Sequence, residues 1–305
     1  MNKVVYYIFY IWMFLHALLP LGVLYILSDV LYLLVYKTIG YRLKVVRLNL
    51  KNAFPEKSEE ERRKIEKDFY HHFCDYFVET IKLFHISDKE MQKRMRFENM
   101  EQVERISQAG NSILMFLGHY GNWEWVPSIN LCKENGKMRL GQIYRPLKNK
   151  AFDDLFLKLR SRFGSFGIAK NNTLREIIRL KKENIQTMIG FMSDQTPSLN
   201  NIHYWTNFMN QDTPVYTGVE RIAKKTGFAV AYLDVQKVKR GYYTASVRLI
   251  SDNPQAEPEN AITERYIREM EKTIMRNPAY WLWTHKRWKW TREKVAAKLA
   301  EQHKK

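Results

Sequence analysis

The sequence predicts an α/β protein with a mixed, mostly parallel central sheet flanked by helices, and with an N-terminal membrane-anchor helix. Beyond residue 110, short apolar runs of strand length alternate with helical patterns, which is typical of a sheet with helices on its faces. Before residue 37, the chain is almost continuously apolar. A length of 305 residues is sufficient for a full hydrophobic core.

The first predicted element is a retained membrane anchor over residues 1–36. In the range Val4–Tyr36 the only ionisable side chains apart from tyrosines are His16 and Asp29, and this run exceeds the roughly 20 residues that a spanning helix needs. A secretory signal peptide has a shorter apolar core and a cleavage site. Pro20 divides the run, so one kinked helix or a helix followed by an interfacial piece would fit. A buried helical hairpin is the alternative.

Basic residues beside the anchor predict its orientation. Lys3 precedes the run, and four cations follow it closely: Lys37, Arg42, Lys44 and Arg47. The positive-inside rule therefore places the rest of the chain, a single domain over residues 37–305, in the cytoplasm. The formal net charge of +18 also predicts an anionic partner. Nucleic acid, a membrane surface and an acidic ligand are the three alternatives. The anchor favours membrane lipids and argues against nucleic acid.

Between the anchor and the predicted sheet, the chain is helical in character from Tyr41 to His85. Ser58 is a predicted N-cap, and Glu61 stands in the capping-box position. Apolar residues recur at every fourth position from Ile65 to Ile81. We expect the face that they form to pack on the core.

Five short apolar runs predict the strands, and five helical patterns predict helices between and after them. The predicted strands are Ile113–Leu117, Met138–Tyr144, Thr187–Met192, Ala229–Val235 and Tyr243–Ile250. The predicted helices are Asn130–Glu134, Phe152–Arg162, Leu174–Lys182, Val219–Lys225 and Ile262–Met275. Arg240 and Gly241 predict a hairpin between the last two strands, and therefore an antiparallel element. The tail from residue 293 is expected to be a short basic helix or a frayed end.

Cysteine and histidine spacing does not support a metal centre or a disulfide framework. Cys74 and Cys132 are the only cysteines and lie far apart, which fits a reducing compartment. His71 and His72 have no carboxylates at ligand spacing, so structural or surface roles are expected for both.

The stretch LGHYGNWEW carries the first candidate site. The preceding LMFL predicts a strand, GHYGN predicts a turn with two glycines, and Asn122 is the expected cap of a helix that begins directly after it. His119 then lies at the C-terminal edge of a strand and Glu124 in the first helical turn. That edge is where open α/β sheets place their active sites.

A histidine and a carboxylate together can take a proton from a poor nucleophile, because the carboxylate fixes the tautomer and stabilises the imidazolium that forms. No GxSxG nucleophile elbow occurs in the chain, so the group to be activated is expected to come from a substrate. A zinc site at His119 and Glu124 lacks a third ligand nearby. A histidine making only a local hydrogen bond at a strand end is the structural alternative.

Several segments resemble, in their order along the chain, those of the secondary (lauroyl/myristoyl) acyltransferases of lipid A biosynthesis, within the lysophospholipid acyltransferase-like superfamily. These segments are RLNLKNAFPEKSEEE, GHYGNWEW, YRPLKN, SDQTP, TGVERIAKKTG and WLWTHKRWK. The resemblance extends over nearly the whole chain, and His119 and Glu124 match the H-x4-D/E motif of the superfamily.

The resemblance implies transfer of a fatty acyl group from acyl carrier protein to a hydroxyl of a lipid A precursor, at the cytoplasmic face of the inner membrane. His119 would be the general base that deprotonates the acceptor hydroxyl, and Glu124 would complete the dyad. No covalent acyl-enzyme, cofactor or metal would be required. The developing oxyanion needs hydrogen-bond donors, for which Arg145 or the backbone amides of residues 118–121 are candidates.

Asp194 is a second candidate carboxylate, because the apolar strand TMIGFM ends just before it and can bring it to the same sheet edge as His119. Either carboxylate could orient the imidazole, and the family pattern favours Glu124. A cap or Asx turn before Pro197 is the structural alternative for Asp194.

The remaining candidates are expected to bind substrate. Arg145 and Lys148 follow a strand, where cations can meet phosphates, and Arg160 is a weaker candidate for the same anionic pocket. Tryptophans interleaved with cations near the C-terminus are typical of a membrane interface, although at least two of these rings are expected to fill the core. The other candidate substrate-binding residues are Asn122, His285, Arg287 and Trp288.

Two rival functions remain open. An acyltransferase could act on another lipid hydroxyl, in a lysophospholipid, an amino-acid-derived lipid or another glycolipid, although Glu124 replaces the aspartate that is usual in glycerolipid acyltransferases. Alternatively, a basic, membrane-tethered scaffold could bind anionic lipids or an acidic carrier without catalysis. The scaffold predicts that His119→Ala leaves function intact.

Overall fold

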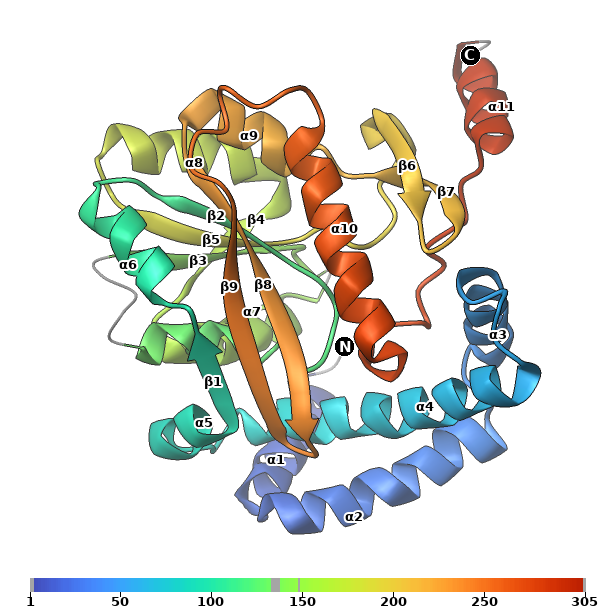
Figure 1. The fold of residues 1–305 in the computed structure, drawn as a ribbon. Helices are drawn as coiled ribbons and strands as arrows, with labels where there is room; N and C mark the ends of the chain where they lie inside the picture. Colours follow the sequence, from blue (N-terminus) through green and yellow to red (C-terminus); the bar gives the residue numbers. More distant parts are fainter. Residues whose placement is uncertain (1–2, 133–137, 148, 304–305) are drawn as a thin grey trace.

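A seven-stranded sheet forms the centre of the protein in a computed structural model that describes residues 3–132, 138–147 and 149–303 (Figure 1). The strand order is β1-β9-β8-β2-β5-β3-β4. The strands are β1 (Met95–Glu98), β2 (Ile113–Leu117), β3 (Arg139–Tyr144), β4 (Phe166–Ala169), β5 (Thr187–Met192), β8 (Ala229–Lys239) and β9 (Tyr242–Ser251). All neighbouring strands are parallel except β8 and β9, so the predicted mixed, mostly parallel sheet is confirmed.

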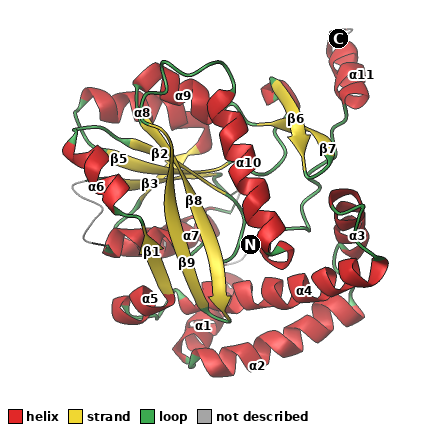
Figure 2. Cartoon of the chain, in the orientation of Figure 1, coloured by secondary structure: helices red, strands yellow, loops and turns green. Residues whose placement is uncertain are grey.

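Helices flank this sheet, and a two-stranded hairpin lies beside α10 (Figure 2). The α-helices are α1 (Lys3–Leu18), α2 (Leu21–Tyr32), α3 (Leu43–Ala53), α4 (Glu59–Lys82), α5 (Asp88–Arg94), α6 (Glu101–Gln108), α7 (Lys150–Arg160), α8 (Thr173–Lys182), α9 (Gly218–Thr226), α10 (Ala261–Arg276) and α11 (Arg292–His303). A π-helical segment, η1 (Leu33–Thr38), continues α2. The small hairpin pairs β6 (Tyr204–Phe208) with β7 (Gln211–Val215).

Short 3-10 helices complete the described elements: η2 (Val126–Leu131), η4 (Ser161–Phe163), η5 (Lys170–Asn172), η6 (Leu199–Asn201) and η7 (Pro278–Tyr280). The helix expected directly after Asn122 is instead a turn that leads into η2. The predicted helix Asn130–Glu134 overlaps only the end of η2, and its part from residue 133 lies outside the described residues.

The five predicted strands are present, and the hairpin at Arg240 and Gly241 is confirmed by the antiparallel pairing of β8 with β9. Gly241 has a φ of 73°, a left-handed conformation that glycine adopts without steric cost. The short strands β1 and β4 were not predicted. Each has four residues at an edge of the sheet, which is too few for a clear apolar period.

The predicted apolar face of α4 packs on the core at Phe69, with Ile65 and Phe73 partly buried against it, but not at Phe77. Ser58 and Glu61 form the expected capping box, but Phe77, on the face predicted to be buried, is 42% exposed. Four residues of an α-helix span about 400°, so each step of four moves the side chain about 40° further around the helix axis. A series of such steps therefore drifts away from a single face. The buried side of α4 also includes polar residues that the apolar pattern does not mark: Glu66, His72, Asp75 and Glu79.

The apolar N-terminal segment folds into two helices separated at Pro20, which precedes the first turn of α2. Among the described residues, one helix, Leu21–Thr38, has the length and the apolar composition needed to cross a membrane. Figure 1 shows α2 running alongside α4, and Leu21 and Leu24 of α2 are buried. Its outer face leaves Ile26 and Val30 exposed.

Candidate active site at the carboxyl edge of β2 and β5

His119 and Asp194 meet because they follow two neighbouring parallel strands at the same register. Leu117 of β2 pairs with Met192 of β5, and each of the two site residues stands two positions beyond its strand. Gly118 stands just before His119, and a Cβ atom there would lie 2.5 Å from the flexible end of Met270 but at an ordinary contact distance of 3.5 Å from Cγ of Asp194. The predicted placement at the carboxyl edge of the sheet is therefore observed.

The carboxylate of Asp194 is buried and holds His119 at two points. His119 Nδ1 lies 2.8 Å from Asp194 Oδ1, and the His119 backbone N–H donates to Oδ2 at 3.0 Å. Trp281 Nε1 also donates to Oδ2, at 2.8 Å. The side chain of Asp194 is fully buried, whereas that of His119 is 20% exposed. Because Nδ1 faces the carboxylate, Nε2 is the ring nitrogen that remains able to accept a proton from another group.

Electrostatics keep Asp194 in its charged form. Burial by itself raises the pKa of Asp194, but the charge of His119 and the hydrogen bonds from His119 and Trp281 outweigh burial, so the pKa lies below its ordinary value. An ionised carboxylate at this place fixes the imidazole tautomer and stabilises the imidazolium.

The expectation that Glu124 orients His119 is corrected by the structure. Glu124 is buried and forms a two-point ion pair with Arg160, at 2.8 Å to Nε and 2.6 Å to Nη2. Tyr76 donates to the same carboxylate at 3.4 Å. No hydrogen bond joins Glu124 to His119, and both residues belong to the described part of the chain. The reason is local: the carboxylate sits in a turn that directs it towards α7.

A cavity of about 340 Å³ opens beside His119. Its wall is mostly apolar, with contributions from β2, β3, β5, η2 and α7, and it includes Leu117, His119, Trp123, Glu124, Val126, Pro127, Leu140, Gly141, Gln142, Ile143, Tyr144, Arg145, Leu147, Arg160, Gly190 and Met192. Four of the predicted site residues thus line this cavity: His119, Glu124, Arg145 and Arg160. An imidazole beside an apolar cavity with two cations suits a ligand that has both an apolar chain and anionic groups.

Arg145 and Arg160 reach this cavity in different states. Arg160 is held by Glu124, and the ion pair and hydrogen bonds raise the pKa of its guanidinium despite the opposing effect of burial. Arg145 is exposed and forms no hydrogen bond or ion pair with the residues that the structure describes. Lys148, the third predicted cation, lies outside the described residues.

Asn122 and two turn amides are engaged within the protein, in contrast to their expected roles. The Asn122 side chain is fully buried and donates to Glu79 at 2.7 Å, so it is inaccessible to substrate. The backbone N–H of His119 donates to Asp194, and that of Gly121 donates to the carbonyl of Tyr280 at 2.9 Å. Neither amide is available to an oxyanion, because each already has an internal acceptor.

The tryptophan-rich C-terminal segment packs behind the site. Trp281 and Trp283 are buried, which confirms that at least two rings fill the core. Arg287 was expected to bind substrate, but its side chain is fully buried and donates to the carbonyl of Pro214. Burial lowers the pKa of Arg287 to about 10.

Two further candidates from this segment do not line the cavity. Trp288 donates through Nε1 to Thr213 at 2.8 Å. His285 is partly buried, and burial lowers its pKa to about 4. Trp281, in contrast, was not assigned to the site, although it contacts Asp194 directly. Its place in WLWTHKRWK was the available signal, but only the tertiary fold brings that segment to β5.

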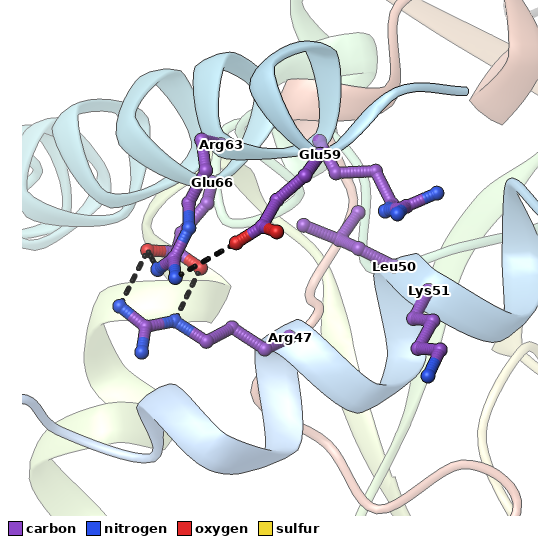
Figure 3. Close-up of a pocket in the computed structure, with 7 residues that line it drawn as sticks. Arg47, Leu50, Lys51, Glu59, Arg63 and Glu66 are labelled. Atoms are coloured by element: carbon purple, nitrogen blue, oxygen red, sulfur yellow. Dashed lines mark hydrogen bonds and ion pairs between the residues drawn. The ribbon is translucent and has the colours of Figure 1, made fainter.

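A second cavity, of about 240 Å³, lies between α3 and the start of α4 and is lined by other residues (Figure 3). The buried carboxylate of Glu66 accepts from Arg47 at 2.9 Å and from Arg63 at 3.4 Å. Arg47 and Arg63 are both partly exposed, and they share this carboxylate. The Arg47–Glu66 ion pair joins α3 to α4, so we interpret this cavity as a helix–helix junction.

Comparison with known proteins places this architecture in a family. The family model described as bacterial lipid A biosynthesis acyltransferase matches residues 1–290. A lipid A biosynthesis palmitoleoyltransferase of Escherichia coli (strain K12) is 24% identical over 251 residues, covering 81% of this chain and 79% of the relative. A lipid A biosynthesis lauroyltransferase of the same organism is 24% identical over 292 residues, covering 92% and 90%. The protein is therefore an acyltransferase and belongs to the bacterial lipid A biosynthesis acyltransferase family.

Proposed function

We propose that the protein transfers a fatty acyl group from acyl carrier protein to a hydroxyl group of a lipid A precursor, with His119 as the general base. The observation that carries this proposal is the His119–Asp194 pair on the wall of an apolar cavity. The family match supports the lipid A precursor as acceptor.

In the proposed reaction the acceptor hydroxyl gives its proton to Nε2 of His119 as its oxygen attacks the thioester carbonyl. The new C–O bond forms, the C–S bond breaks, and the proton passes from the imidazolium to the leaving thiolate. Asp194 stabilises the imidazolium throughout. Because the acceptor oxygen attacks the thioester carbonyl directly, the proposed reaction passes through no covalent acyl-enzyme.

Arg160 and Arg145 are the proposed cationic contacts of the substrates. Glu124 accepts from Nε and Nη2 of Arg160, which fixes the guanidinium on the cavity wall and leaves Nη1 for an oxyanion or phosphate. Arg145, exposed and lining the same cavity, is suited to a phosphate of the glycolipid.

The cavity is proposed to hold a fatty acyl chain. Leu117, Leu140, Ile143 and Met192 give it an apolar wall, and burial of each methylene group contributes about 0.8 kcal/mol to binding. Such a wall is poorly matched to a purely polar acceptor.

We further propose that residues 1–36 anchor the domain of residues 37–305 on the cytoplasmic side of the inner membrane. Phe9 of α1 contacts Phe152 of α7, with 5.3 Å between ring centroids, so the apolar segment lies against a helix that also bounds the cavity. Because α2 has one face on α4, an arrangement along the interface is favoured over a span surrounded by lipid.

Lipid mass spectrometry tests the proposed function. Membranes containing the wild-type protein or His119→Ala are incubated with acyl carrier protein-linked fatty acids and a lipid A precursor. A mass increase of one acyl group with the wild type alone supports the proposal. An acyl product on a different lipid would refute the acceptor, and equal acylation by His119→Ala would refute the mechanism.

A further inference from the structure

We infer that Glu79 is a positioning residue for the turn that carries His119, and that Tyr25 of the apolar helix α2 acts on this turn through Glu79. The N-terminal segment is then part of the catalytic scaffold as well as an anchor. The inference rests on the proposed role of His119 as the base.

Glu79 is a completely buried carboxylate on α4 that joins three elements. Its Oε1 accepts from the hydroxyl of Tyr25 on α2 at 2.9 Å. Its Oε2 accepts from Asn122 in the turn after β2 at 2.7 Å and from Tyr243 on β9 at 2.8 Å. All three donors bond to the same carboxylate, so the position of Glu79 is coupled to the positions of the three donor side chains.

The turn after β2 is held from the α4 side at further points. Asn122 Oδ1 accepts from the backbone N–H of Trp125 at 3.2 Å, and Trp125 Nε1 donates to the backbone carbonyl of Glu79 at 3.1 Å. His72 Nε2 lies 3.2 Å from the carbonyl of Gly121. Gly121 has a φ of 59°, a left-handed conformation that glycine adopts without steric cost.

Burying the carboxylate of Glu79 costs desolvation free energy that an apolar side chain filling the same space would not cost. Burial raises the pKa of Glu79, and the charge of Lys237 with the hydrogen bonds from Asn122 and Tyr243 only partly opposes this effect. An apolar side chain of similar size would avoid the desolvation, but it would leave buried donors without an acceptor. The presence of a buried carboxylate here is thus explained by the hydrogen-bond donors that it holds in position. One of these donors, Asn122, lies three residues from His119.

The link to α2 extends beyond Tyr25. Ser28 donates to Asp75 of α4 at 2.8 Å, and Arg240 at the tip of the β8–β9 hairpin pairs with both Asp75 and Asp29. The apolar helix is therefore bonded to the same part of α4 that holds the turn. A shift of α2 would be transmitted to Glu79 through hydrogen bonds and not only through apolar packing.

The chain contains a matched control for Tyr25. Tyr36, at the other end of the same apolar segment, donates to the buried Glu66 of α4 at 2.8 Å. Tyr25 and Tyr36 thus make the same kind of bond between the same two parts of the protein. Only the Glu79 end contacts the turn of His119.

The experiment compares four variants of the full-length protein in membranes: Tyr25→Phe, Tyr36→Phe, Glu79→Leu and Glu79→Gln. Acyl-transfer kcat and KM, thermal unfolding and hydrogen exchange of the peptide containing residues 118–125 are measured. Glu79→Leu is expected to lower kcat by on the order of 10²-fold, since a misplacement of about 1 Å has such effects. Glu79→Gln retains an acceptor for Asn122 and should restore most of kcat.

Tyr25→Phe is expected to lower kcat severalfold with unchanged KM and to speed exchange in residues 118–125. Tyr36→Phe should leave kcat and this exchange unchanged, even if it lowers the unfolding temperature equally. Equal kcat and exchange for the two tyrosine variants, or a kcat loss in Glu79→Leu that follows only the unfolded fraction, would overturn the inference. Absence of acyl transfer by wild type would refute the proposed function instead, while the exchange measurement would still test Glu79.

Discussion

Asp194 binds His119 through both its imidazole ring and its backbone amide, at 2.8 and 3.0 Å. The two contacts fix the ring and the chain that carries it with one buried carboxylate. A residue 75 positions away therefore sets the tautomer of the proposed base.

Replacing Asp194 by asparagine is expected to lower kcat by about 10²- to 10⁴-fold, because an amide can no longer stabilise the imidazolium. Steady-state acyl-transfer rates measure this loss. Thermal unfolding is the control, and a folded Asp194→Asn protein with a wild-type kcat would show that the carboxylate is not required.

Glu124 is expected to act through Arg160. Glu124→Gln and Arg160→Met should each weaken acyl transfer, and the double variant should be little worse than the poorer single variant, since contacting residues couple by about 0.5–3 kcal/mol. A double-mutant cycle on kcat/KM measures this coupling. Losses that simply add would separate the two residues and return Glu124 to an independent role.

Gly190 offers a test of the acyl cavity. A Cβ atom there would lie 3.4 Å from Cδ2 of Leu117, so alanine fits, whereas a leucine side chain would enter the cavity. We expect Gly190→Leu to shift donor preference towards shorter acyl chains, while Gly190→Ala changes it less. Competition between donors of different length, analysed by mass spectrometry, measures the shift. An unchanged length profile for Gly190→Leu would place the chain elsewhere.

The outer face of α2 is expected to contact lipid. Ile26 and Val30 are 64% and 60% exposed, so Ile26→Lys with Val30→Lys should reduce membrane association with little loss of folding stability. Flotation with vesicles of anionic and zwitterionic lipid measures it. Val238, another exposed aliphatic residue at 64%, provides the matched control in Val238→Lys. Equal flotation of all variants would argue against lipid contact by this face.

His72 predicts an acid-dependent loss of stability. Burial, assisted by the charge of Lys237, lowers the pKa of His72 well below its ordinary value. Below about pH 6.5 the unfolded chain takes up a proton there that the folded protein does not. The free energy of unfolding should therefore fall as the pH decreases from 7 to 5.5, with a slope of up to about 1.4 kcal/mol per pH unit from this residue.

Denaturant unfolding at several pH values measures the slope. His72→Gln retains a donor for Gly121 and should flatten it, while the exposed His203→Gln should not. An equal slope in wild type and His72→Gln would exclude His72 as the source.

The sequence predicted the strands of the sheet more accurately than it predicted which side chains bond to one another in the site. Apolar runs such as Ile113–Leu117 and Thr187–Met192 have the length and composition of buried strands, and both are strands with the predicted bounds. The family pattern, in contrast, favoured Glu124 as the partner of His119, whereas the structure pairs His119 with Asp194. The direction of a turn separates Glu124 from His119, whereas the register of β2 against β5 brings Asp194 to His119. A local sequence pattern does not contain this register.

The buried polar network was also beyond the reach of sequence patterns. Glu79 and Asp75 stand on α4 among residues that a helical period would assign to the surface, because carboxylates are seldom buried without partners. Their partners come from α2 and from the β8–β9 hairpin. Only the assembled fold brings these donors together.

The most direct test of the central claim is the acyl-transfer rate of His119→Ala measured beside His203→Ala, whose histidine is exposed and outside the cavity wall. We predict a loss on the order of 10²- to 10⁴-fold for His119→Ala, with folding retained, and a wild-type rate for His203→Ala. A folded His119→Ala protein that transfers acyl groups at the wild-type rate would contradict His119 as the general base.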